Sequence, residues 1–172
     1  MSKLVPVLSQ TDIQAKVKSL AHAISADYAG KNLVAIGVLK GAFIFLADLV
    51  RHISVPTQID FVRLTSYGSD TKSSGKVRIT KDIELDIKGK DVLVVEDIID
   101  SGLTLTFLVE HLKKFNPLSV KVCALIDKTE RREKEVPVDY TGFTIESGFL
   151  VGYGLDCNED YRGLPDINNL KL

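Results

Sequence analysis

Three short, mostly apolar runs constrain the fold of this chain more than any other feature. They cover residues 33–38, 91–96 and 120–126, and each has the length of a single strand. Strands that are apolar on both sides are typical of a sheet with both faces covered. Helical periodicity lies between them, at residues 42–53 and 103–115. This alternation predicts an α/β fold with a mostly parallel sheet flanked by helices.

Further elements are predicted on either side of this core. A helix should begin after Ser9, because its hydroxyl and the acidic Asp12 three residues later form a capping pattern. Apolar residues then repeat at helical spacing up to Gly30, where the helix is expected to stop. Two shorter strands are predicted at residues 143–145 and 150–151.

A strand and a polar segment lie between the first two apolar runs. Residues 57–64 alternate in polarity, which predicts a strand with Ile59, Phe61 and Arg63 on one face. Residues 66–76 are polar with one aromatic side chain, and such a segment cannot bury itself. It is either a passive hairpin loop or a flexible lid, and composition favours neither.

Composition and charge exclude several classes of protein. The 172 residues fit one domain, residues 1–172, and the net charge of −1 gives no electrostatic case for binding nucleic acid or a membrane surface. No apolar run approaches the ~20 residues of a membrane span, and the N-terminus lacks the apolar core of a signal peptide. Cys123 and Cys157 are too few for a disulfide framework. We therefore expect a cytoplasmic protein with reduced thiols.

Residues 92–104 carry the strongest functional signal. Glu96 and Asp97 end the central strand, and a third acid, Asp100, follows two apolar residues later. Ligands of open α/β sheets bind just outside the carboxyl ends of the strands. Adjacent carboxylates at that position suit ribose hydroxyls or a magnesium ion.

The turn after these acids is typical of a phosphate site. Its backbone N–H groups lie at a helix N-terminus, where anions bind, and Gly102 permits close approach of the backbone. The alternative is that the acids are solvated and that Ser101 only caps the helix. That alternative leaves the three acids at the mouth of an apolar strand unexplained. The residues of the predicted 5'-phosphate site are Asp100, Ser101, Gly102, Leu103 and Thr104.

Residues 95–104, Val-Glu-Asp-Ile-Ile-Asp-Ser-Gly-Leu-Thr, resemble the phosphoribosyl pyrophosphate motif of the type I phosphoribosyltransferases, in particular of their hypoxanthine-guanine branch. The resemblance extends from about residue 33 to residue 165. It implies a twisted, mostly parallel sheet and a small hood built from N- and C-terminal segments, with the C-terminal part at about residues 140–172. Residues 39–41, 66–68, 125–128, 149–156 and 161–162 resemble further segments of that branch, in the same order along the chain.

The same resemblance implies the roles of individual residues. Lys128 would donate to the 6-oxygen of the purine, which selects hypoxanthine and guanine over adenine, whose 6-amino group is a donor. Residues 39–41 would form a pyrophosphate loop of a kind that often carries a non-proline cis peptide. The residues assigned in this way are Lys40, Gly41 and Arg162 for pyrophosphate, Ser66 and Tyr67 for a flexible catalytic loop over residues 66–76, Glu96 and Asp97 for ribose, Lys128, Phe149, Leu150 and Asp156 for the purine, and Glu96, Asp97 and Asp156 for Mg²⁺.

The implied reaction transfers a phosphoribosyl group from phosphoribosyl pyrophosphate to hypoxanthine or guanine, with Mg²⁺ as cofactor and a homodimer or homotetramer as the assembly. The sequence offers no obvious nucleophile paired with a base, which suits a displacement driven by charge stabilisation. Asp100 would act as the general base toward the purine N7.

Two other hypotheses remain at this point. A non-catalytic regulator could keep the phosphoribosyl pyrophosphate site, although Asp100, Lys128 and the pair Ser66 and Tyr67 are all present. A sister transferase could act on adenine, orotate, uracil or xanthine, although Lys128 with Phe149 favours a 6-oxopurine. The charged residues 130–135 that follow Lys128 are interpreted as a solvated turn.

Overall fold

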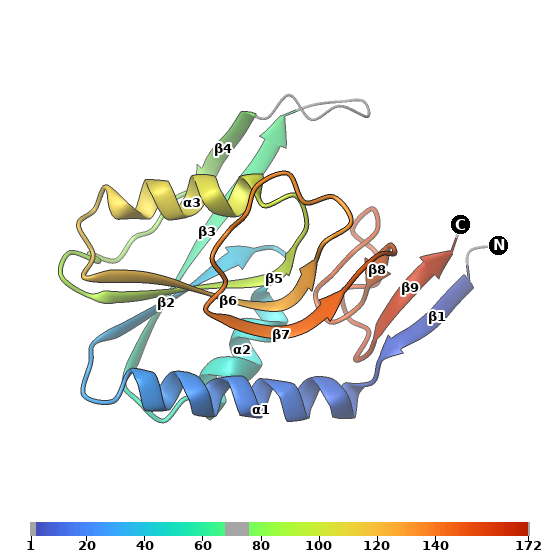
Figure 1. The fold of residues 1–172 in the computed structure, drawn as a ribbon, viewed down its shortest axis with the longest axis horizontal. Helices are drawn as coiled ribbons and strands as arrows, with labels where there is room; N and C mark the ends of the chain where they lie inside the picture. Colours follow the sequence, from blue (N-terminus) through green and yellow to red (C-terminus); the bar gives the residue numbers. More distant parts are fainter. Residues whose placement is uncertain (1–2, 68–75, 172) are drawn as a thin grey trace.

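A computed structural model describes residues 3–67 and 76–171 as two β-sheets and three helices (Figure 1). In these residues no helix combines the length and the apolar character needed to span a membrane. The elements, in chain order, are β1 (Lys3–Leu8), α1 (Gln10–Asp27), β2 (Leu33–Leu39), α2 (Phe43–His52), β3 (Thr57–Tyr67), β4 (Lys76–Lys81), β5 (Asp91–Ile99), α3 (Leu103–Lys113), β6 (Ser119–Lys128), β7 (Tyr140–Ile145), β8 (Leu150–Val151) and β9 (Ile167–Lys171).

The larger sheet confirms the predicted fold class. Its strand order is β4-β3-β2-β5-β6-β7, and every neighbouring pair from β3 to β7 is parallel. Only the edge strand β4 runs antiparallel, paired with β3. The parallel arrangement brings the carboxyl ends of β2, β5 and β6 to one edge of the sheet, where a ligand site is expected.

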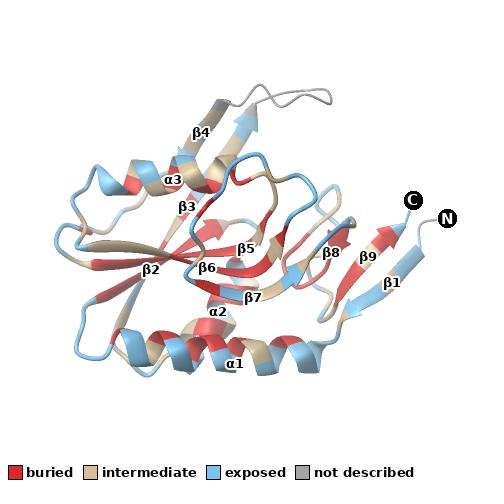
Figure 2. Ribbon diagram, in the orientation of Figure 1, coloured by how far each residue is buried: buried red, intermediate tan, exposed pale blue. Residues whose placement is uncertain are grey.

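Helices cover both faces of this sheet, with α1 and α2 on one side and α3 on the other (Figure 1). The strand β5 serves both layers, because its side chains alternate between the two faces. Leu93 and Val95 pack in the cluster that includes α1 and α2, whereas Val92 and Val94 pack with α3. Figure 2 shows the central strands and the inner side of α1 as buried. The double cover explains why these strands are apolar throughout.

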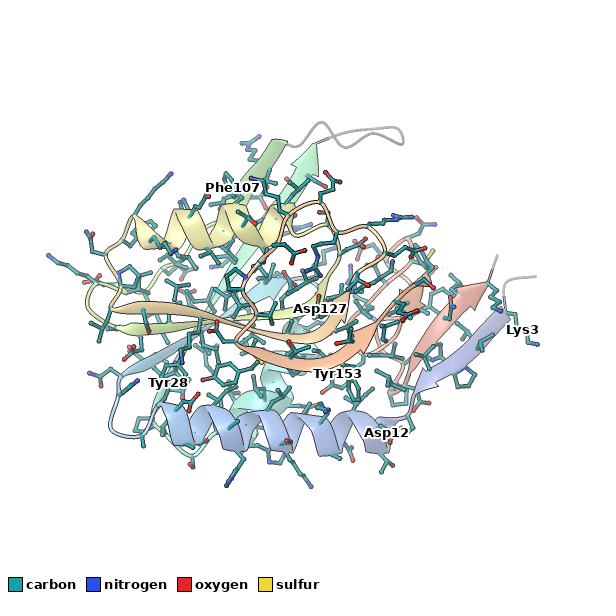
Figure 3. The ribbon with its side chains drawn as sticks, in the orientation of Figure 1. Lys3, Asp12, Tyr28, Phe107, Asp127 and Tyr153 are labelled. Carbon is teal, nitrogen blue, oxygen red and sulfur yellow. The ribbon has the colours of Figure 1, made fainter. Side chains whose placement is uncertain are left out.

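The first helix begins with the predicted capping box. The backbone N–H of Asp12 donates to Ser9 Oγ over 3.2 Å, and the backbone N–H of Ser9 donates to Asp12 Oδ2 over 3.3 Å. The helix ends at Asp27, three residues before the predicted stop, and Tyr28 follows as its cap. Gly30 instead takes a left-handed φ of 74° in the turn beyond. Figure 3 shows Asp12 and Tyr28 at the two ends of α1.

The smaller sheet is the hood, in the order β1-β9-β8, and it joins N- and C-terminal segments as expected. Its predicted lower bound near residue 140 is wrong, because β7 pairs with β6 in the larger sheet. Tyr140 is buried in the main core and donates its hydroxyl to Asp27 Oδ2 over 2.6 Å, which ties β7 to α1. The C-terminal part of the hood therefore begins after Ile145.

The strand β3 has the predicted alternation, with Ile59 and Phe61 on one face. Phe61 packs against the cluster of α1 and α2, whereas Ile59 is 45% exposed, and Asp60 and Val62 on the other face are buried. Asp60 is accommodated because its carboxylate accepts the backbone N–H groups of Phe61, Glu84 and Leu85. An acid, Asp60, thus lies beside the apolar Val62 on the more buried face of β3.

The predicted loop at residues 66–76 is shorter than expected at both ends. Ser66 and Tyr67 belong to β3 and pair with Val77 and Lys76 of β4. The rest of the predicted loop, residues 68–75, lies outside the described residues.

Candidate functional site

Two adjoining cavities lie at the carboxyl edge of the larger sheet. The larger has a volume of about 490 Å³ and the smaller about 170 Å³. Ile98 and Asp100 line both, so the end of β5 and the turn after it form the boundary between them. The predicted site residues that line the larger cavity are Lys40, Gly41, Asp97, Asp100, Lys128, Phe149, Leu150, Asp156 and Arg162.

The smaller cavity is formed by the turn that opens α3. Its predicted residues are Glu96, Asp100, Ser101, Gly102 and Thr104. Gly102 has a left-handed φ of 83°, and a Cβ there would lie 2.3 Å from the carbonyl oxygen of Lys134. The position therefore requires glycine both for its backbone conformation and for the close approach of the 129–136 segment.

That neighbouring segment fixes the phosphate turn through the backbone. The carbonyl oxygen of Ser101 accepts the N–H of Glu133 over 2.9 Å and the N–H of Lys134 over 3.0 Å. These bonds leave the hydroxyls of Ser101 and Thr104 at the cavity, beside the N-terminus of α3. The arrangement is suited to binding an anion at a helix N-terminus.

Two predicted residues line neither cavity. Leu103 is the first residue of α3, and its backbone N–H donates to Ser101 Oγ over 3.3 Å. Ser66 is exposed on β3. The side chain of Tyr67 lies outside the described residues.

The adjacent acids Glu96 and Asp97 are both buried at the end of β5. Burial and the neighbouring carboxylate raise the pKa of Glu96 well above its usual value. Burial also raises the pKa of Asp97, against hydrogen bonds from Glu96 and from the N–H of Ile98. Such a pair favours either a shared proton or a bound cation.

The Asp97 carboxylate also lies directly against the backbone of the pyrophosphate loop. A Cβ at Gly41 would lie 1.8 Å from Asp97 Oδ2, so this contact excludes any side chain at Gly41. The peptide bond between Leu39 and Lys40 is cis, in the loop for which the resemblance implied it.

The three acids predicted to hold a metal do not form a closed cage. Asp97 and Asp156 line the larger cavity, whereas Glu96 lines the smaller one. Within residues 3–67 and 76–171, no three His, Cys, Asp or Glu side chains are grouped as a metal site. Mg²⁺ is usually held by one or two carboxylates together with substrate phosphates and water. Asp97 and Asp156 fit that mode of binding.

Asp100 and Lys128 lie next to each other in the lining of the larger cavity. Lys128 is buried, with its Nζ 3.8 Å from Asp100 Oδ1 and 3.3 Å from Glu130 Oε2. Asp100 Oδ1 is itself buried, and within the described part of the chain it accepts no hydrogen bond. A buried acceptor without a donor is costly unless a ligand supplies one.

The interpretation of residues 130–135 as a solvated turn is wrong for Arg132. Its side chain is only 11% exposed and forms an ion pair with Asp127, at the carboxyl end of β6 (Figure 3). Its Nε donates to the carbonyl oxygen of Asp100 and its Nη2 to that of Lys128, both over 3.0 Å. Arg132 therefore joins the loop after β5 to the end of β6, and the three available partners explain why this charge is inside.

Arg162 also lines the larger cavity. Its Nη1 donates to the carbonyl oxygen of Gly154 over 2.7 Å, and its Nη2 lies 3.0 Å from Asp156 Oδ1. Gly154 packs so closely that a Cβ there would lie 2.0 Å from the carbonyl oxygen of Gly41. The two segments predicted to bind pyrophosphate are thus in contact, although 113 residues separate Gly41 from Gly154 (154 − 41).

The hood supplies the aromatic wall of this cavity. Phe149 is 48% exposed, and Leu150 beside it is buried. The backbone of Phe149 is held at both polar groups, since its N–H donates to Asn169 Oδ1 over 3.2 Å and its carbonyl accepts the N–H of Leu170 over 2.8 Å. An exposed ring on a fixed backbone is suited to stacking against a planar ligand.

Sequence reasoning missed several residues of the larger cavity. Glu130 had been assigned to the solvated turn, yet it pairs with Lys128 and accepts the N–H of Gly148 over 3.3 Å. Its place two residues after the end of β6 gives only a weak signal. The lining residues that were not predicted are Ile98, Glu130, Arg131, Gly148 and Leu155.

Comparison with known proteins places this site in a family. Residues 7–158 match the family described as Phosphoribosyl transferase domain. A hypoxanthine-guanine phosphoribosyltransferase of Bacillus subtilis is 46% identical over 165 residues, which are 96% of this chain and 92% of that protein. One of Mycobacterium bovis is 48% identical over 170 residues, 95% of this chain and 84% of that protein.

Solved structures agree with the sequence relatives. A Bacillus anthracis hypoxanthine-guanine phosphoribosyltransferase, with a HEPES molecule in its active site, superposes with a TM-score of 0.92 at 46% identity, covering 100% of both chains. A Staphylococcus aureus hypoxanthine phosphoribosyltransferase superposes with a TM-score of 0.93 at 42% identity, covering 96% of this chain and 90% of that chain. The family match covers residues 7–158 and includes every residue that lines the two cavities except Arg162: the chain belongs to the phosphoribosyltransferase family.

Proposed function

We propose that this protein transfers the 5-phosphoribosyl group of phosphoribosyl pyrophosphate to hypoxanthine or guanine, with release of pyrophosphate. The observation that carries the proposal is the pairing of Asp100 and Lys128 in one cavity. Asp100 Oδ1 is buried and accepts no hydrogen bond from the described part of the chain, and it lies 3.8 Å from the amine of the buried Lys128.

A 6-oxopurine complements this pair. Its N7 proton can be donated to Asp100, and its 6-oxygen can accept from Lys128. Adenine carries an amino group at the 6-position, which would meet the donor Lys128 with another donor. Phe149 would stack on the ring, because its side chain is exposed at the cavity and its backbone is fixed.

The smaller cavity suits the 5'-phosphate of the other substrate. The N-terminus of α3 and the hydroxyls of Ser101 and Thr104 supply donors there. Glu96 lines the same cavity, which favours a role toward the ribose hydroxyls. Lys40 and Arg162 line the larger cavity and would hold the pyrophosphate.

Mg²⁺ is proposed as the cofactor, with Asp97 and Asp156 as the protein groups nearest to it. When bound, the ion would neutralise charge on the pyrophosphate leaving group. Both acids line the larger cavity beside Lys40 and Arg162, so the cation and the leaving group would share one wall.

The proposed mechanism is a displacement at the anomeric carbon without a covalent enzyme intermediate. The residues orient the two substrates, and Asp100 takes the N7 proton as the new bond forms. Closure of residues 66–76 over the site, with Ser66 and Tyr67 at its start, remains part of the proposal. It would exclude water from the activated sugar.

Three further points remain proposals. The chain would form a single domain, residues 1–172. It would assemble as a homodimer or homotetramer, which sedimentation analysis can test. It would act in the cytoplasm, where its two free cysteines would stay reduced.

The decisive experiment is turnover of single bases with phosphoribosyl pyrophosphate and Mg²⁺. Hypoxanthine, guanine, xanthine and adenine are assayed separately, with Asp100→Asn as the test variant. We expect turnover of hypoxanthine or guanine, and a fall in kcat of about 10²- to 10⁴-fold on removal of the base. The matched control is Asp86→Asn, at an exposed aspartate that lines neither cavity.

Turnover of adenine or xanthine alone would overturn the purine assignment but leave the transferase. Binding of phosphoribosyl pyrophosphate without turnover of any base would favour the regulator instead.

A further inference from the structure

A tight turn beside the larger cavity carries a carboxylate that the proposed reaction does not use. The N–H of Asp160 donates to the carbonyl oxygen of Cys157 over 3.0 Å, which closes the turn. Its central residues, Asn158 and Glu159, have positive φ values of 51° and 69°. Both values lie in the left-handed region, as in a type I′ turn, where glycine and asparagine are favoured. A glutamate at the second position is therefore unusual for its backbone.

The Glu159 carboxylate binds both cations that are proposed to hold pyrophosphate. Its Oε1 lies 2.9 Å from Lys40 Nζ, and its Oε2 lies 3.2 Å from Arg162 Nη2. Lys40 first, and then Arg162, lower the pKa of this carboxyl, so Glu159 is ionised at neutral pH. One anion thus bridges two cations that come from segments far apart in the chain.

The bridge is placed where a ligand can displace it. The side chain of Glu159 is 61% exposed and does not line the cavity, whereas Lys40 and Arg162 do. Its carboxylate can therefore turn into water at little cost. Arg162 keeps a second partner, Asp156, at 3.0 Å, and its bond to the carbonyl of Gly154. Loss of the Glu159 contact would leave the guanidinium in place.

We propose that Glu159 holds the two cations of the pyrophosphate subsite in the free protein and competes with pyrophosphate for Lys40 and Arg162. This inference rests on the proposed function, since it assumes that those cations bind the pyrophosphate group. Incoming phosphate oxygens exchange with the carboxylate, and on product release Glu159 returns to the two cations. The residue therefore weakens binding of pyrophosphate and assists its departure.

The inference predicts that removing the charge of Glu159 tightens the binding of pyrophosphate, whereas the loss of a charged residue beside a site usually weakens binding. Glu159→Gln keeps the shape of the side chain but not its charge. Because two exposed ion pairs that hold Lys40 and Arg162 are removed, pyrophosphate binding should tighten by about three- to tenfold. The dissociation constant is measured by titration calorimetry of the full chain with pyrophosphate and Mg²⁺. The gain should shrink at high salt, where surface charges are screened.

Glu84→Gln is the matched control. Glu84 is an exposed glutamate whose Oε1 lies 2.9 Å from Lys81 Nζ, and it lines neither cavity. We expect no change in pyrophosphate affinity there. A second test variant, Glu159→Asn, suits the left-handed backbone better and is too short to bridge the cations, so it should reproduce the gain.

The outcomes separate the inference from the function on which it rests. Tighter binding in both Glu159 variants supports the competition. Unchanged or weaker binding, with a wild type that binds pyrophosphate, would overturn it and make Glu159 a residue that only positions the cations. A wild type that binds no pyrophosphate would overturn the pyrophosphate subsite together with the inference.

Discussion

The amine nitrogen of Lys128 lies 3.8 Å from Oδ1 of Asp100, and both residues line the same cavity. The lysine stands at the end of β6 and the aspartate in the loop after β5, so neighbouring parallel strands bring them together. This spacing leaves room for the edge of a planar base to exchange one donor and one acceptor with the protein.

Lys128→Gln should change the preference among purines. Hydrogen bonds to charged groups are worth about 1.5–3 kcal/mol, so kcat/KM for hypoxanthine should fall by about 10- to 100-fold. The value for adenine should fall less, because its 6-amino group gains nothing from a lysine donor. Steady-state kinetics with both bases measures the ratio. Equal losses for the two bases would remove Lys128 from base selection.

Gly41→Ala should impair the site without unfolding the chain. The new Cβ would lie 1.8 Å from Asp97 Oδ2, so either the loop or the carboxylate must move. A displacement of about 1 Å at a reacting centre can lower the rate by ~10²-fold, and we expect a loss of that order in kcat/KM for phosphoribosyl pyrophosphate. Gly163→Ala is the control, since its Cβ would meet nothing within 4 Å. Similar kinetics in the two variants would contradict the proposed contact.

Arg132→Gln should affect both stability and catalysis, because Arg132 supports the loop that carries Asp100. Buried partners left without a donor cost about 1–3 kcal/mol in the free energy of unfolding. Urea denaturation measures that cost, and kinetics should show a lower kcat from the displaced aspartate. Arg51→Gln, at an arginine whose side chain is 71% exposed, should do neither. A full kcat in a destabilised Arg132→Gln protein would limit the role of Arg132 to folding.

Asp60 should make stability depend on pH in the acid range. Burial alone would raise the pKa of Asp60, but three backbone N–H groups and Lys81 outweigh it and hold the pKa below its usual value. A lowered native pKa means that the folded state favours the charged form. The stabilisation is therefore complete above the unfolded pKa of about 3.9 and is lost as the pH falls through the lower native value.

Asp60→Asn tests this directly. The variant should lose about 1–3 kcal/mol of unfolding free energy at neutral pH. Urea denaturation at a series of pH values should show the difference from wild type shrinking below about pH 4. A difference that stays constant from neutral to acid pH would show that the charge of Asp60 does not contribute.

Local sequence predicts most of the central architecture. The strands β2, β5 and β6 can be predicted from the sequence because a sheet covered on both faces needs apolar residues at nearly every position. The turn at residues 100–104 can be predicted for a different reason. Gly102 and the hydroxyl residues beside it are close in the sequence, so all the groups that would bind a phosphate lie within one turn.

The strands that were not predicted depend on distant partners. β1 contains Pro6 and pairs with β9, so that Lys3 lies opposite Lys171. Neither strand has the continuous apolar run of a central strand, and only their pairing across the chain specifies them. The same applies to β4, an edge strand that forms on β3.

The contacts of Arg132 and Glu159 also could not be predicted from the sequence. Arg132 lies within a run of charges whose composition is that of a solvated turn, and only packing buries it against Asp127. Glu159 meets Lys40 across 119 residues of chain (159 − 40). No local pattern encodes a contact of that separation.

The two hydrogen bonds from Glu133 and Lys134 to the carbonyl oxygen of Ser101 have a consequence for the order of events in catalysis. They attach the turn at residues 100–104, which would bind the phosphate, to the segment that begins at Lys128, which would bind the base. A substrate that orders one of these segments therefore also restrains the other. Binding free energies coupled in this way are reciprocal. Phosphoribosyl pyrophosphate should therefore raise the affinity for the base by the same factor that the base raises the affinity for phosphoribosyl pyrophosphate, and the encounter that completes the ternary complex becomes cooperative.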